Sequence, residues 1–444
     1  MKKIRILFAS LIGSVIEWYD FYLYGTATGL VFSSLFFPSA DPAISIILAF
    51  ATFGAGYAAR PIGSLLFGHM GDRIGRKASL MLTLIGMGGS SFLMGLLPTY
   101  QQIGIMAPVL LVVLRLVQGF ALGGEWGGAV LLATESAPKG IRGLFGSIPQ
   151  LGVPIGLVLG TFSFSIISAL TTDAQFLAWG WRIPFLFSIV LILIAVWIRS
   201  GIEETPEFQH KKENGQLAKM PVVNLFKYNS KDVLRIIGLK LGDGLFNVFI
   251  MSFIITYATT YLSYSKDIAL MGVSIGCITM LVSIPLVGYF SDFIGRKIIY
   301  VGSLIGMFVL AIPYFLIIPE SEILFYIMQA VVLGILWGAI FSTQGTFFSE
   351  LFPANVRYTG LSFSYQIAAA VAGFGPMLWT VVADRFGPNP FVFGGLMMAG
   401  LFISLLLSFF APDTRKVTLY EEIEENKEIE ETKLNQKEGV LTNN

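Results

Sequence analysis

Charged residues are scarce in this sequence. Only 13% of its 444 residues are Asp, Glu, Lys or Arg, whereas roughly a quarter are charged in an ordinary soluble domain. A soluble protein of this length could not cover its apolar surface with so few charges. The net charge of +1 argues against nucleic acid as a partner, because binding it needs a basic surface. The composition therefore excludes a soluble or intrinsically disordered chain.

Cysteine and histidine are nearly absent. Cys277 is the one cysteine, so the chain has no disulfide scaffold. His69 and His210 are the two histidines, and with one cysteine they make neither a His/Cys metal cluster nor a nucleophile–base triad. The dipeptide Gly-Lys does not occur, which excludes a Walker A loop and an ATP-driven pump in this chain. We expect no enzyme, no cofactor and no metal.

Hydrophobic runs, in contrast, are long and numerous. Residues AVILMFWYC make up 55% of the chain, and glycine adds 48 positions. A helix needs roughly 20 mostly apolar residues to cross about 30 Å of hydrocarbon. The runs lack the strict alternation of a transmembrane β-barrel, so they predict an all-α integral membrane protein. Twelve stretches qualify as spans: 6–37, 44–68, 78–98, 106–134, 143–170, 183–200, 236–262, 268–290, 298–319, 323–348, 358–383 and 391–411.

The basic residues predict the orientation in the membrane. An even number of spans places both termini on one side, and Lys and Arg concentrate on the cytoplasmic side. With the N-terminus inside, 23 of the 29 basic residues are cytoplasmic. A basic N-terminus precedes the first span, but Glu17 and Asp20 interrupt that span and it is too long for a cleaved signal peptide. We expect a multi-pass protein of the plasma or inner membrane with both termini cytoplasmic.

The two halves of the chain repeat each other. Residues 71–77 (GDRIGRK) recur at 291–297 (SDFIGRK), and Glu135-Ser-Ala-Pro138 recurs as Glu350-Leu-Phe-Pro353. A glutamine follows each copy, at Gln150 and Gln366. Parallel six-helix repeats are typical of transporters whose halves rock about a central site. The predicted organisation is an N-terminal six-helix bundle (1–200), a cytoplasmic linker (201–235), a C-terminal six-helix bundle (236–411) and an acidic, disordered tail (412–444).

Several of these segments resemble the major facilitator superfamily, and within it the metabolite:proton symporter family. The segments that carry the resemblance are Asp72-Arg-Ile-Gly-Arg-Lys77, Arg115-Leu-Val-Gln-Gly119, Glu17-Trp-Tyr-Asp-Phe21, Arg60-Pro-Ile-Gly63, and Trp179-Gly-Trp-Arg-Ile-Pro184 followed by Glu203-Glu-Thr-Pro206. The resemblance covers nearly the whole chain. It implies the major facilitator fold, with 12 transmembrane helices in two pseudo-symmetric six-helix bundles, and proton-coupled uptake of a small organic solute.

The resemblance also assigns a cytoplasmic gate. In the superfamily this loop is an ion-pair latch that holds the two halves together on the inside. The role carries over, position by position, to Asp72, Arg73, Gly75 and Arg76 in the first copy and to Asp292 and Arg296 in the second. Phe293 replaces the first arginine in the second copy, so we expect a weaker latch there. A loop that serves only the positive-inside rule is the alternative.

A few charges lie at membrane depth, where each costs several kcal/mol unless it is paired or hydrated. At about 1.5 Å per residue, Glu17 and Arg60 lie roughly 18 Å deep, and Glu125 about 15 Å deep. Asp20 is one turn beyond Glu17 on the same helix face. Arg115 lies nearer the outer boundary of its span. A structural network, in which arginines only neutralise carboxylates, is the alternative for each of them.

These charges and their polar neighbours are the candidate functional residues. A carboxylate that loses its cationic partner is easier to protonate, whereas arginine keeps its charge and suits a substrate carboxylate. The proton-coupling candidates are Glu17, Asp20, Glu125 and Asp243, and the substrate-binding candidates are Arg60, Arg115, Tyr24, Gln150, Asn247 and Gln366. Lys240 is shallow enough to reach the cytoplasmic face. A Lys240–Asp243 pair is the alternative for those two residues.

Three functions are compatible with these features. The first is proton-coupled uptake of a small organic solute that carries a carboxylate, either an organic acid or a zwitterion. The second is an uncoupled facilitator or exchanger of the same fold. The third is a membrane sensor that binds a solute without moving it. The expected partners are a small-molecule solute, protons and the lipid bilayer, and the chain is expected to be a monomer.

Overall fold

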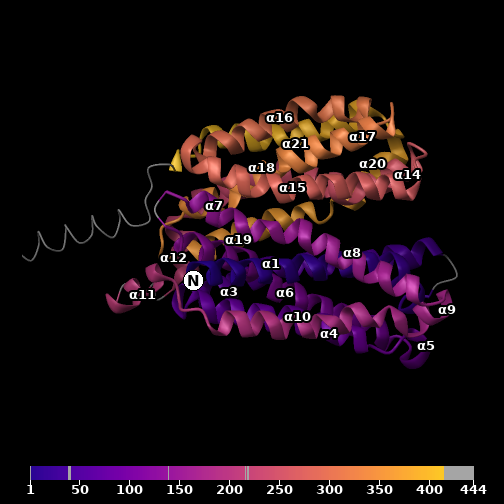
Figure 1. The fold of residues 1–444 in the computed structure, drawn as a ribbon, viewed down its shortest axis with the longest axis horizontal. Coiled ribbons are helices and arrows are strands. Elements are labelled where there is room, and N and C mark those ends of the chain that lie inside the picture. Colours follow the sequence, from indigo (N-terminus) through magenta and orange to yellow (C-terminus); the bar gives the residue numbers. More distant parts are fainter. Residues whose placement is uncertain (1, 39–41, 139, 216, 218–219, 415–444) are drawn as a thin grey trace, which may run out of the picture.

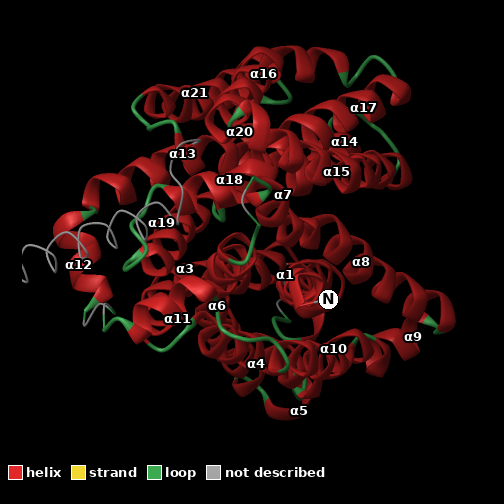
Figure 2. Ribbon diagram, turned by 60° about the vertical axis from the view of Figure 1, so that its left-hand side comes forward, coloured by secondary structure: helices red, strands yellow, loops and turns green. Residues whose placement is uncertain are grey.

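The structure is a computed structural model that describes residues 2–38, 42–138, 140–215, 217 and 220–414. Within these residues all regular structure is helical (Figure 2). The first half contains α1 (Lys2–Ala27), η1 (Thr28–Phe32), α2 (Ser33–Leu35), α3 (Pro42–Arg73), α4 (Arg76–Leu96), α5 (Tyr100–Ile103), α6 (Met106–Glu135), α7 (Arg142–Ser147), η2 (Ile148–Leu151), α8 (Gly152–Leu170), α9 (Asp173–Gln175), η3 (Phe176–Gly180) and α10 (Arg182–Ser200). The predicted tail lies outside the described residues beyond Thr414.

The second half continues the helical pattern. It contains α11 (Pro206–Glu213), α12 (Pro221–Tyr228), α13 (Ser230–Val248), η4 (Phe249–Phe253), α14 (Ile254–Thr260), α15 (Lys266–Ile294), α16 (Arg296–Ile317), α17 (Glu322–Gln329), η5 (Ala330–Trp337), α18 (Gly338–Glu350), α19 (Arg357–Ala372), α20 (Gly375–Phe386) and α21 (Pro390–Phe409). Three of the spans are built from consecutive elements without a break, such as α17–η5–α18 over Glu322–Glu350.

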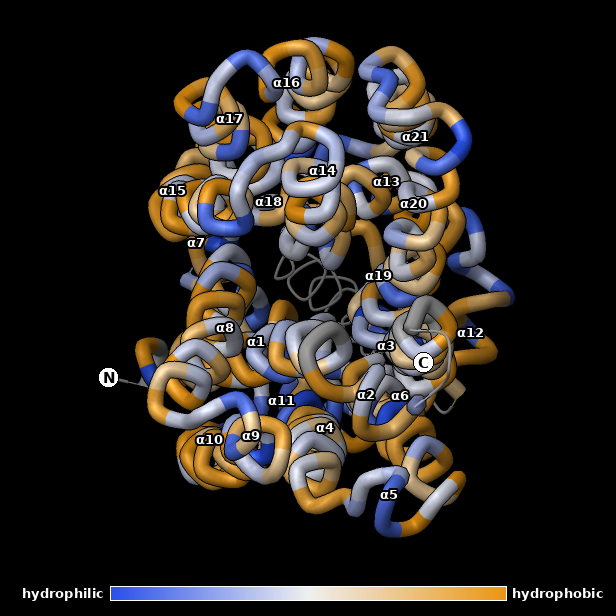
Figure 3. The backbone as a smooth tube through the Cα atoms, turned by 90° about the vertical axis from the view of Figure 1, so that its right-hand side faces the viewer, coloured by the Kyte–Doolittle hydropathy of each residue, from blue (hydrophilic) through white to orange (hydrophobic). Residues whose placement is uncertain are grey.

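The helices have the length and apolarity of membrane spans. Among the described residues, 11 helical segments are long and apolar enough to cross a membrane. The remaining predicted span, 44–68, lies within α3, a continuous helix of 32 residues that packs against α6. Large apolar side chains such as Ile62 and Trp197 are exposed on the outside of the bundles. Hydrophobic stretches run along the helices, and polar residues gather in connections such as those near α5 and α9 (Figure 3).

The helices form two bundles that lie side by side (Figure 1). One contains α1, α3, α4, α6, α8 and α10, and the other contains α13, α15, α16, α18, α19 and α21. The contacts that join the bundles include those between α19 and α3 and between α15 and α7. The N-terminus, α11 and α12 lie at one end of the molecule, which we call the linker end (Figure 1). The linker itself contains two short helices, and α13 begins at Ser230, before the predicted boundary at 236.

Glycines let helices of the first bundle approach closely. A Cβ at Gly123 of α6 would lie 2.3 Å from the carbonyl oxygen of Arg60 on α3. A Cβ at Gly156 of α8 would lie 2.6 Å from Cβ of Trp18 on α1. The small-xxx-small spacing of these spans therefore serves helix–helix packing, and it holds α1 and α3 against the helices that complete the site.

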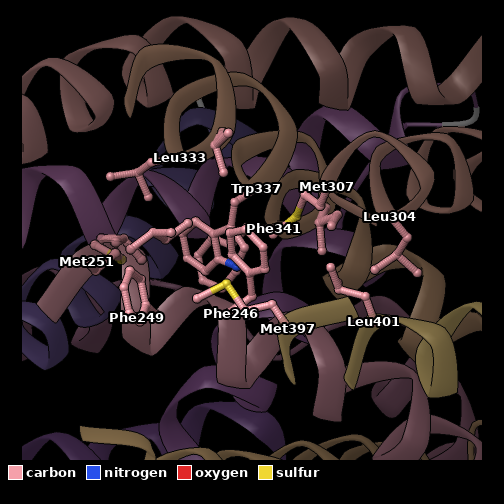
Figure 4. Close-up of a cluster of buried hydrophobic side chains, with 14 of the residues drawn as sticks. Phe246, Phe249, Met251, Leu304, Met307, Leu333, Trp337, Phe341, Met397 and Leu401 are labelled. Atoms are coloured by element: carbon pink, nitrogen blue, oxygen red, sulfur yellow. The ribbon is translucent and has the colours of Figure 1, made fainter. Parts of the chain in front are cut away.

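The second bundle has a core of large apolar and aromatic side chains (Figure 4). Trp337 and Phe341 stack with ring centroids 4.7 Å apart. Trp337 ends the π-helical segment η5, and Phe341 follows on α18. Such π-helical segments are frequent at functional sites. Trp18 of α1 also contacts Phe341, at 6.3 Å between ring centroids, so this core extends to the first bundle.

Candidate functional site

Glu17 and Arg60 form the polar centre of the first bundle. Glu17 lies on α1 and Arg60 on α3, and both are buried, at 4% and 6% exposure. The Arg60 guanidinium stands over the Tyr57 ring, 4.3 Å from its centroid. Arg60 is the opposite charge that acts most strongly on Glu17. Within the described residues, Oε2 of Glu17 and Nε of Arg60 have no hydrogen-bond partner. Both groups are thus available to a proton or a solute.

Asp20 belongs to a second polar group, one helical turn away. Its Oδ1 accepts a hydrogen bond from Ser188 of α10 at 3.2 Å, and its Oδ2 has no partner in the described part of the chain. The Arg115 charge also acts on Asp20. Arg115 donates to Gln118, whose amide donates to Ser91 at 2.6 Å. Gln118 and Ser91, which our sequence predictions omitted, therefore connect Arg115 to the surroundings of Asp20.

Tyr24 lies with Arg115. The Arg115 guanidinium is 4.0 Å from the centroid of the Tyr24 ring, and the Tyr24 hydroxyl is hydrogen-bonded to Thr52. Arg115 is 1% exposed. The two substrate-binding candidates are therefore adjacent, and a solute can reach Arg115 only if neighbouring side chains move.

Glu125 is paired with a residue that the sequence did not single out. Arg199, from the last turn of α10, reaches back into the bundle and donates to both carboxylate oxygens of Glu125. Thr83 donates to the same carboxylate at 2.5 Å, and Arg199 also donates to the Leu80 carbonyl at 2.7 Å. Both charges are buried. This arrangement gives Glu125 a structural partner, and its role in proton coupling stays a prediction.

Arg199 escaped sequence reasoning because its position at the end of a span is typical of a cytoplasmic residue. Nothing in the sequence distinguishes it from its basic neighbours in the linker. Helix α1 lies close to the ion pair between Arg199 and Glu125. A Cβ at Gly13 of α1 would lie 1.7 Å from Nη2 of Arg199. Gly13 therefore leaves the space in which the guanidinium lies.

Amide side chains and an aromatic pair lie where the two bundles meet. Trp126 of α6 stacks on Tyr365 of α19, with ring centroids 3.7 Å apart. Trp126 donates to Oε1 of Gln150 at 3.1 Å, and the Gln366 amide donates weakly to the Leu122 carbonyl at 3.4 Å. Three polar atoms of the predicted amide residues have no partner among the described residues: Nε2 of Gln150, Oε1 of Gln366 and Oδ1 of Asn247.

Gln344 of α18 extends this amide cluster. Its side chain is fully buried, and neither its oxygen nor its nitrogen has a hydrogen-bond partner within the described residues. The neighbouring Gly345 faces the Gln150 amide, since a Cβ there would be 2.8 Å from Nε2 of Gln150. Buried polar groups without partners call for an explanation. Both donors and acceptors are present, which suits a hydroxylated or carbonyl-bearing solute.

Lys240 and Asp243 form a buried ion pair in the second bundle. The Lys240 Nζ lies 2.6 Å from Oδ2 of Asp243, and both side chains are nearly inaccessible. Lys240 is 3% exposed, so the expectation that it reaches the cytoplasmic face is wrong. The Tyr300 hydroxyl approaches Oδ1 of Asp243 at 3.5 Å. The alternative pairing predicted from the i,i+3 spacing is the one that the structure has.

The first gate copy joins the two bundles at the linker end. Asp72 accepts hydrogen bonds from the backbone nitrogens of Tyr358 and Thr359, at 3.2 and 2.9 Å, and from the Thr359 hydroxyl at 2.8 Å. These donors belong to the first turn of α19, so the carboxylate of one bundle caps a helix of the other. Arg76 holds Asp72 in place through an ion pair of 2.8 Å.

Arg76 also begins a buried chain of charges. It lies 3.2 Å from Glu135, which lies 3.9 Å from Arg357 of the second bundle. The ion pair between Arg357 and Glu207 of the linker, at 2.6 Å, ends the chain. Glu135 and Arg357 belong to the repeated segments. Nothing in the sequence marked Glu207 as functional except that it directly follows the Glu203–Pro206 segment.

The second gate copy is arranged in the same way. Asp292 accepts from the backbone nitrogens of Gly143 and Leu144 at 2.8 and 3.2 Å, and so caps α7 of the first bundle. Arg296 holds Asp292 at 2.8 Å and approaches Glu350 at 3.5 Å. The predicted difference between the copies was based on Phe293. In the described part of the chain Arg73 is exposed and has no hydrogen bond or ion pair, and the weaker latch of the second copy stays a prediction.

Glycine is required at the turn of each gate loop. Gly75 has φ of 126° and Gly295 has φ of 110°, values that side-chain-bearing residues rarely adopt. At Gly75 the turn also brings Glu204 of the linker against the start of α4. Glu204 accepts from the backbone nitrogens of Arg76 and Lys77 at 3.0 and 3.1 Å. The linker therefore contributes two acidic residues to the closed linker end.

Taken together, these contacts describe a closed linker end beneath a buried polar centre. No group of three or more His, Cys, Asp or Glu residues that could hold a metal ion occurs among the described residues. The groups present can bind a small polar solute between the bundles and can take up or release protons.

Comparison with known proteins supports this interpretation. Residues 10–376 match the sequence pattern of the Major Facilitator Superfamily. The chain is 40% identical to the shikimate transporter of Escherichia coli K12 over 418 residues, which cover 93% of this chain and 95% of that protein. It is 40% identical to an E. coli K12 inner membrane metabolite transport protein over 91% of this chain and 93% of that protein. With the E. coli K12 proline/betaine transporter the identity is 35%, over 86% of this chain and 79% of the relative.

A solved structure has the same fold. The proton:xylose symporter XylE bound to 6-bromo-6-deoxy-D-glucose superposes with a TM-score of 0.75, covering 94% of this chain and 98% of that one. The sequence identity is 19%. This likeness confirms the predicted fold class, with its two pseudo-symmetric bundles.

Proposed function

The chain belongs to the Major Facilitator Superfamily and is a membrane transporter, and we propose that it is a proton-coupled symporter for a small carboxylate-bearing solute. It takes up the solute across the plasma or inner membrane by alternating access. The linker end faces the cytoplasm, with both termini on that side. Shikimate and proline or betaine are solutes of its relatives and are the first compounds to test.

The observation that carries the proposal is the pair of buried carboxylates on α1. Glu17 and Asp20 are 4% and 1% exposed, and each has one oxygen without a hydrogen-bond partner among the described residues. Each is also influenced by an arginine, Arg60 and Arg115 respectively. A carboxylate that is only partly compensated in a membrane protein is a default candidate for a proton relay. A purely structural charge would be fully paired, as Glu125 is.

The position of the arginines supports carboxylate recognition. Arg60 lies near the polar centre with part of its guanidinium unpaired, and a guanidinium binds a carboxylate through two parallel hydrogen bonds. The guanidinium also stands over the Tyr57 ring, and its charge acts on Glu17. A solute carboxylate that takes Arg60 would release Glu17 to bind a proton, and this exchange would couple the two fluxes.

The capped helices at the linker end support alternating access. Asp72 and Asp292 hold the same end closed from opposite bundles, through contacts that a rocking motion would break together. The solute site lies between the bundles, as in other transporters built from repeats.

Uptake into proteoliposomes tests the proposal. The purified chain is reconstituted, and uptake of labelled shikimate, citrate, α-ketoglutarate, proline and glycine betaine is measured with and without an imposed proton gradient. We expect accumulation of at least one carboxylate only with the gradient. Glu17→Gln or Asp20→Asn should abolish accumulation while exchange of labelled for unlabelled solute continues, because exchange needs no net proton movement.

Asp232→Asn is the matched control, since Asp232 is a partly exposed carboxylate that pairs with Arg235 at the start of α13. It should accumulate solute as the parent does. Accumulation that is unchanged in both α1 variants, with the same pH dependence, would contradict the coupling role. Uptake that ignores the gradient would favour the facilitator, and binding without uptake would favour the sensor.

The orientation is tested by cysteine labelling. Cys277 is buried, so Cys277→Ser provides a background without reactive thiols. Asn214→Cys lies in the linker and Gln101→Cys in the connection at the opposite end, and both positions are exposed. In intact cells a membrane-impermeant maleimide should label position 101 and spare position 214 until the cells are opened. The reverse pattern would show that the linker end faces outward.

A further inference from the structure

The ammonium group of Lys240 is surrounded by aromatic rings. Its Nζ lies 5.3 Å from the centroid of the Tyr365 ring and 6.0 Å from those of Trp337 and Phe341. These distances are within the range of cation–π contacts. We call the three rings the aromatic cage. Trp337 and Phe341 are both visible in the core of the second bundle, stacked on each other (Figure 4).

The cage lies where the two bundles meet. Tyr365 stacks on Trp126 of the first bundle, and Phe341 contacts Trp18 of α1. The charges of Glu17 and Arg60 act on Tyr365 from the first bundle, and the charge of Asp243 acts on it from the second. Lys240 is therefore the cation that the second bundle presents beside the proposed solute site.

A structural ion pair with Asp243 does not use all of the hydrogen-bonding capacity of Lys240. An ammonium group has three protons to donate. Within the described residues Nζ donates one hydrogen bond, to Asp243 at 2.6 Å. The aromatic faces attract the charge but do not replace directional acceptors. Lys240 can thus keep Asp243 and still donate to a carboxylate on a solute.

The same arrangement disfavours a solute with its own fixed positive charge. Aromatic cages are a common means of binding quaternary ammonium groups. Here the ammonium of Lys240 already lies beside all three rings, at 5.3 to 6.0 Å from their centroids, and it would repel a second cation. On α13 and α18, the helices that carry Lys240 and Phe341, Oδ1 of Asn247 and both polar atoms of Gln344 lack partners in the described part of the chain. Uncharged amides of this kind suit hydroxyl and carbonyl groups.

We propose that Lys240 binds a carboxylate of the solute, and that the solute is an organic anion with hydroxyl or carbonyl groups and without a quaternary ammonium group. This inference rests on the proposed transport function and narrows its substrate class. It assigns organic acids to the site and excludes betaines. Arg60 from the first bundle and Lys240 from the second would then approach the same bound anion from opposite sides.

Equilibrium binding tests the inference without any gradient. Labelled shikimate, citrate and α-ketoglutarate are bound to the purified full-length chain, and unlabelled glycine betaine is added as a competitor. We expect at least one anion to bind saturably and a 100-fold excess of betaine to leave that binding unchanged. The Lys240→Met/Asp243→Asn variant removes both charges together, so no buried charge is left alone, and it should weaken anion binding roughly 10- to 100-fold.

Two single variants complete the experiment. Lys231→Met removes an exposed lysine from the first turn of the same helix and should leave the anion Kd unchanged. Lys240→Arg keeps the charge and should retain most of the affinity that the double variant loses. If the double variant binds the anion as tightly as the parent, if betaine displaces the anion as well as the unlabelled anion does, or if none of the anions binds, the inference is overturned.

The outcomes separate this inference from the proposed function. Gradient-driven accumulation of betaine would support symport and overturn the role of Lys240. Anion binding that depends on Lys240, without accumulation under a gradient, would support the role of Lys240 and overturn symport.

Discussion

Replacing Asp72 with asparagine should open the linker end. The Asp72 carboxylate accepts three hydrogen bonds from the start of α19, at 2.8, 2.9 and 3.2 Å, and it is 3% exposed. An asparagine would keep one acceptor oxygen, lose the charge and turn an amide donor toward backbone donors. A charge-assisted hydrogen bond contributes about 1.5–3 kcal/mol. A charge at a partly buried helix N-terminus adds up to about 2 kcal/mol.

The loss therefore amounts to roughly 3 kcal/mol or more between the closed and open states. This shifts their equilibrium by about 100-fold. Spin labels at Ile74→Cys and Phe293→Cys, both exposed and on opposite bundles, report the opening in the Cys277→Ser background. Pulsed electron–electron distance measurements in nanodiscs should show a longer separation in the Asp72→Asn variant than in its parent.

Two comparisons sharpen this prediction. The Asp292 carboxylate accepts two backbone hydrogen bonds, whereas that of Asp72 accepts three hydrogen bonds. Asp292→Asn should therefore lengthen the distance between the spin labels less than Asp72→Asn does. Arg73→Gln removes a charge from the same loop but no contact among the described residues, and the distance distribution should stay that of the parent. If Asp72→Asn leaves the distribution unchanged, or if Arg73→Gln shifts it as far, capping of α19 does not hold the linker end closed.

Two further predictions concern packing and buried charge. Gly63→Ala places a Cβ 1.7 Å from the Phe120 carbonyl oxygen, so the melting midpoint in detergent should fall by roughly 3 °C or more. Gly89→Ala is the control: its Cβ meets nothing within 4 Å, and it should not lower the melting midpoint. Equal midpoints for the two variants would refute close α3–α6 contact. Arg199→Met leaves Glu125 as a buried charge without its partner and should lower the free energy of unfolding by about 3–5 kcal/mol, measured as lost folded yield. The double variant Arg199→Met/Glu125→Gln should regain most of that yield. Failure of the double variant to recover would contradict the pairing.

The sequence predicted those features that depend on a short segment alone: the spans, the turn glycines and the pairing of residues on one helix. Crossing hydrocarbon demands long apolar runs, so the spans could be located without any tertiary contact, and the fold class that they predicted is confirmed. The repeated loop at 71–77 and 291–297 contained the turn glycines, because positive φ leaves glycine as the residue of choice. The i,i+3 spacing of Lys240 and Asp243 likewise made their pairing foreseeable from helix geometry.

Partner choice among distant charges was not foreseeable in this way. Glu125 could have paired with Arg60 or Arg115, yet it pairs with Arg199, which the sequence placed among cytoplasmic residues. Glu207 was one of several acids in a polar linker until the fold brought it to Arg357. Such pairings depend on which helix faces meet and how closely, and that is set by contacts such as Gly13 against the Arg199 guanidinium.

By itself, then, the sequence determined that the chain lies in a membrane, how many times it crosses and that acidic residues such as Glu17, Asp20 and Glu125 are buried. It could do so because apolar length, turn geometry and the cost of burying a charge are properties of short segments. Only the tertiary structure decided that Asp72 and Asp292 cap helices of the opposite bundle, and that Lys240 lies in a cage of aromatic rings. Those arrangements join residues about a hundred or more positions apart, and their geometry exists only once the bundles have packed.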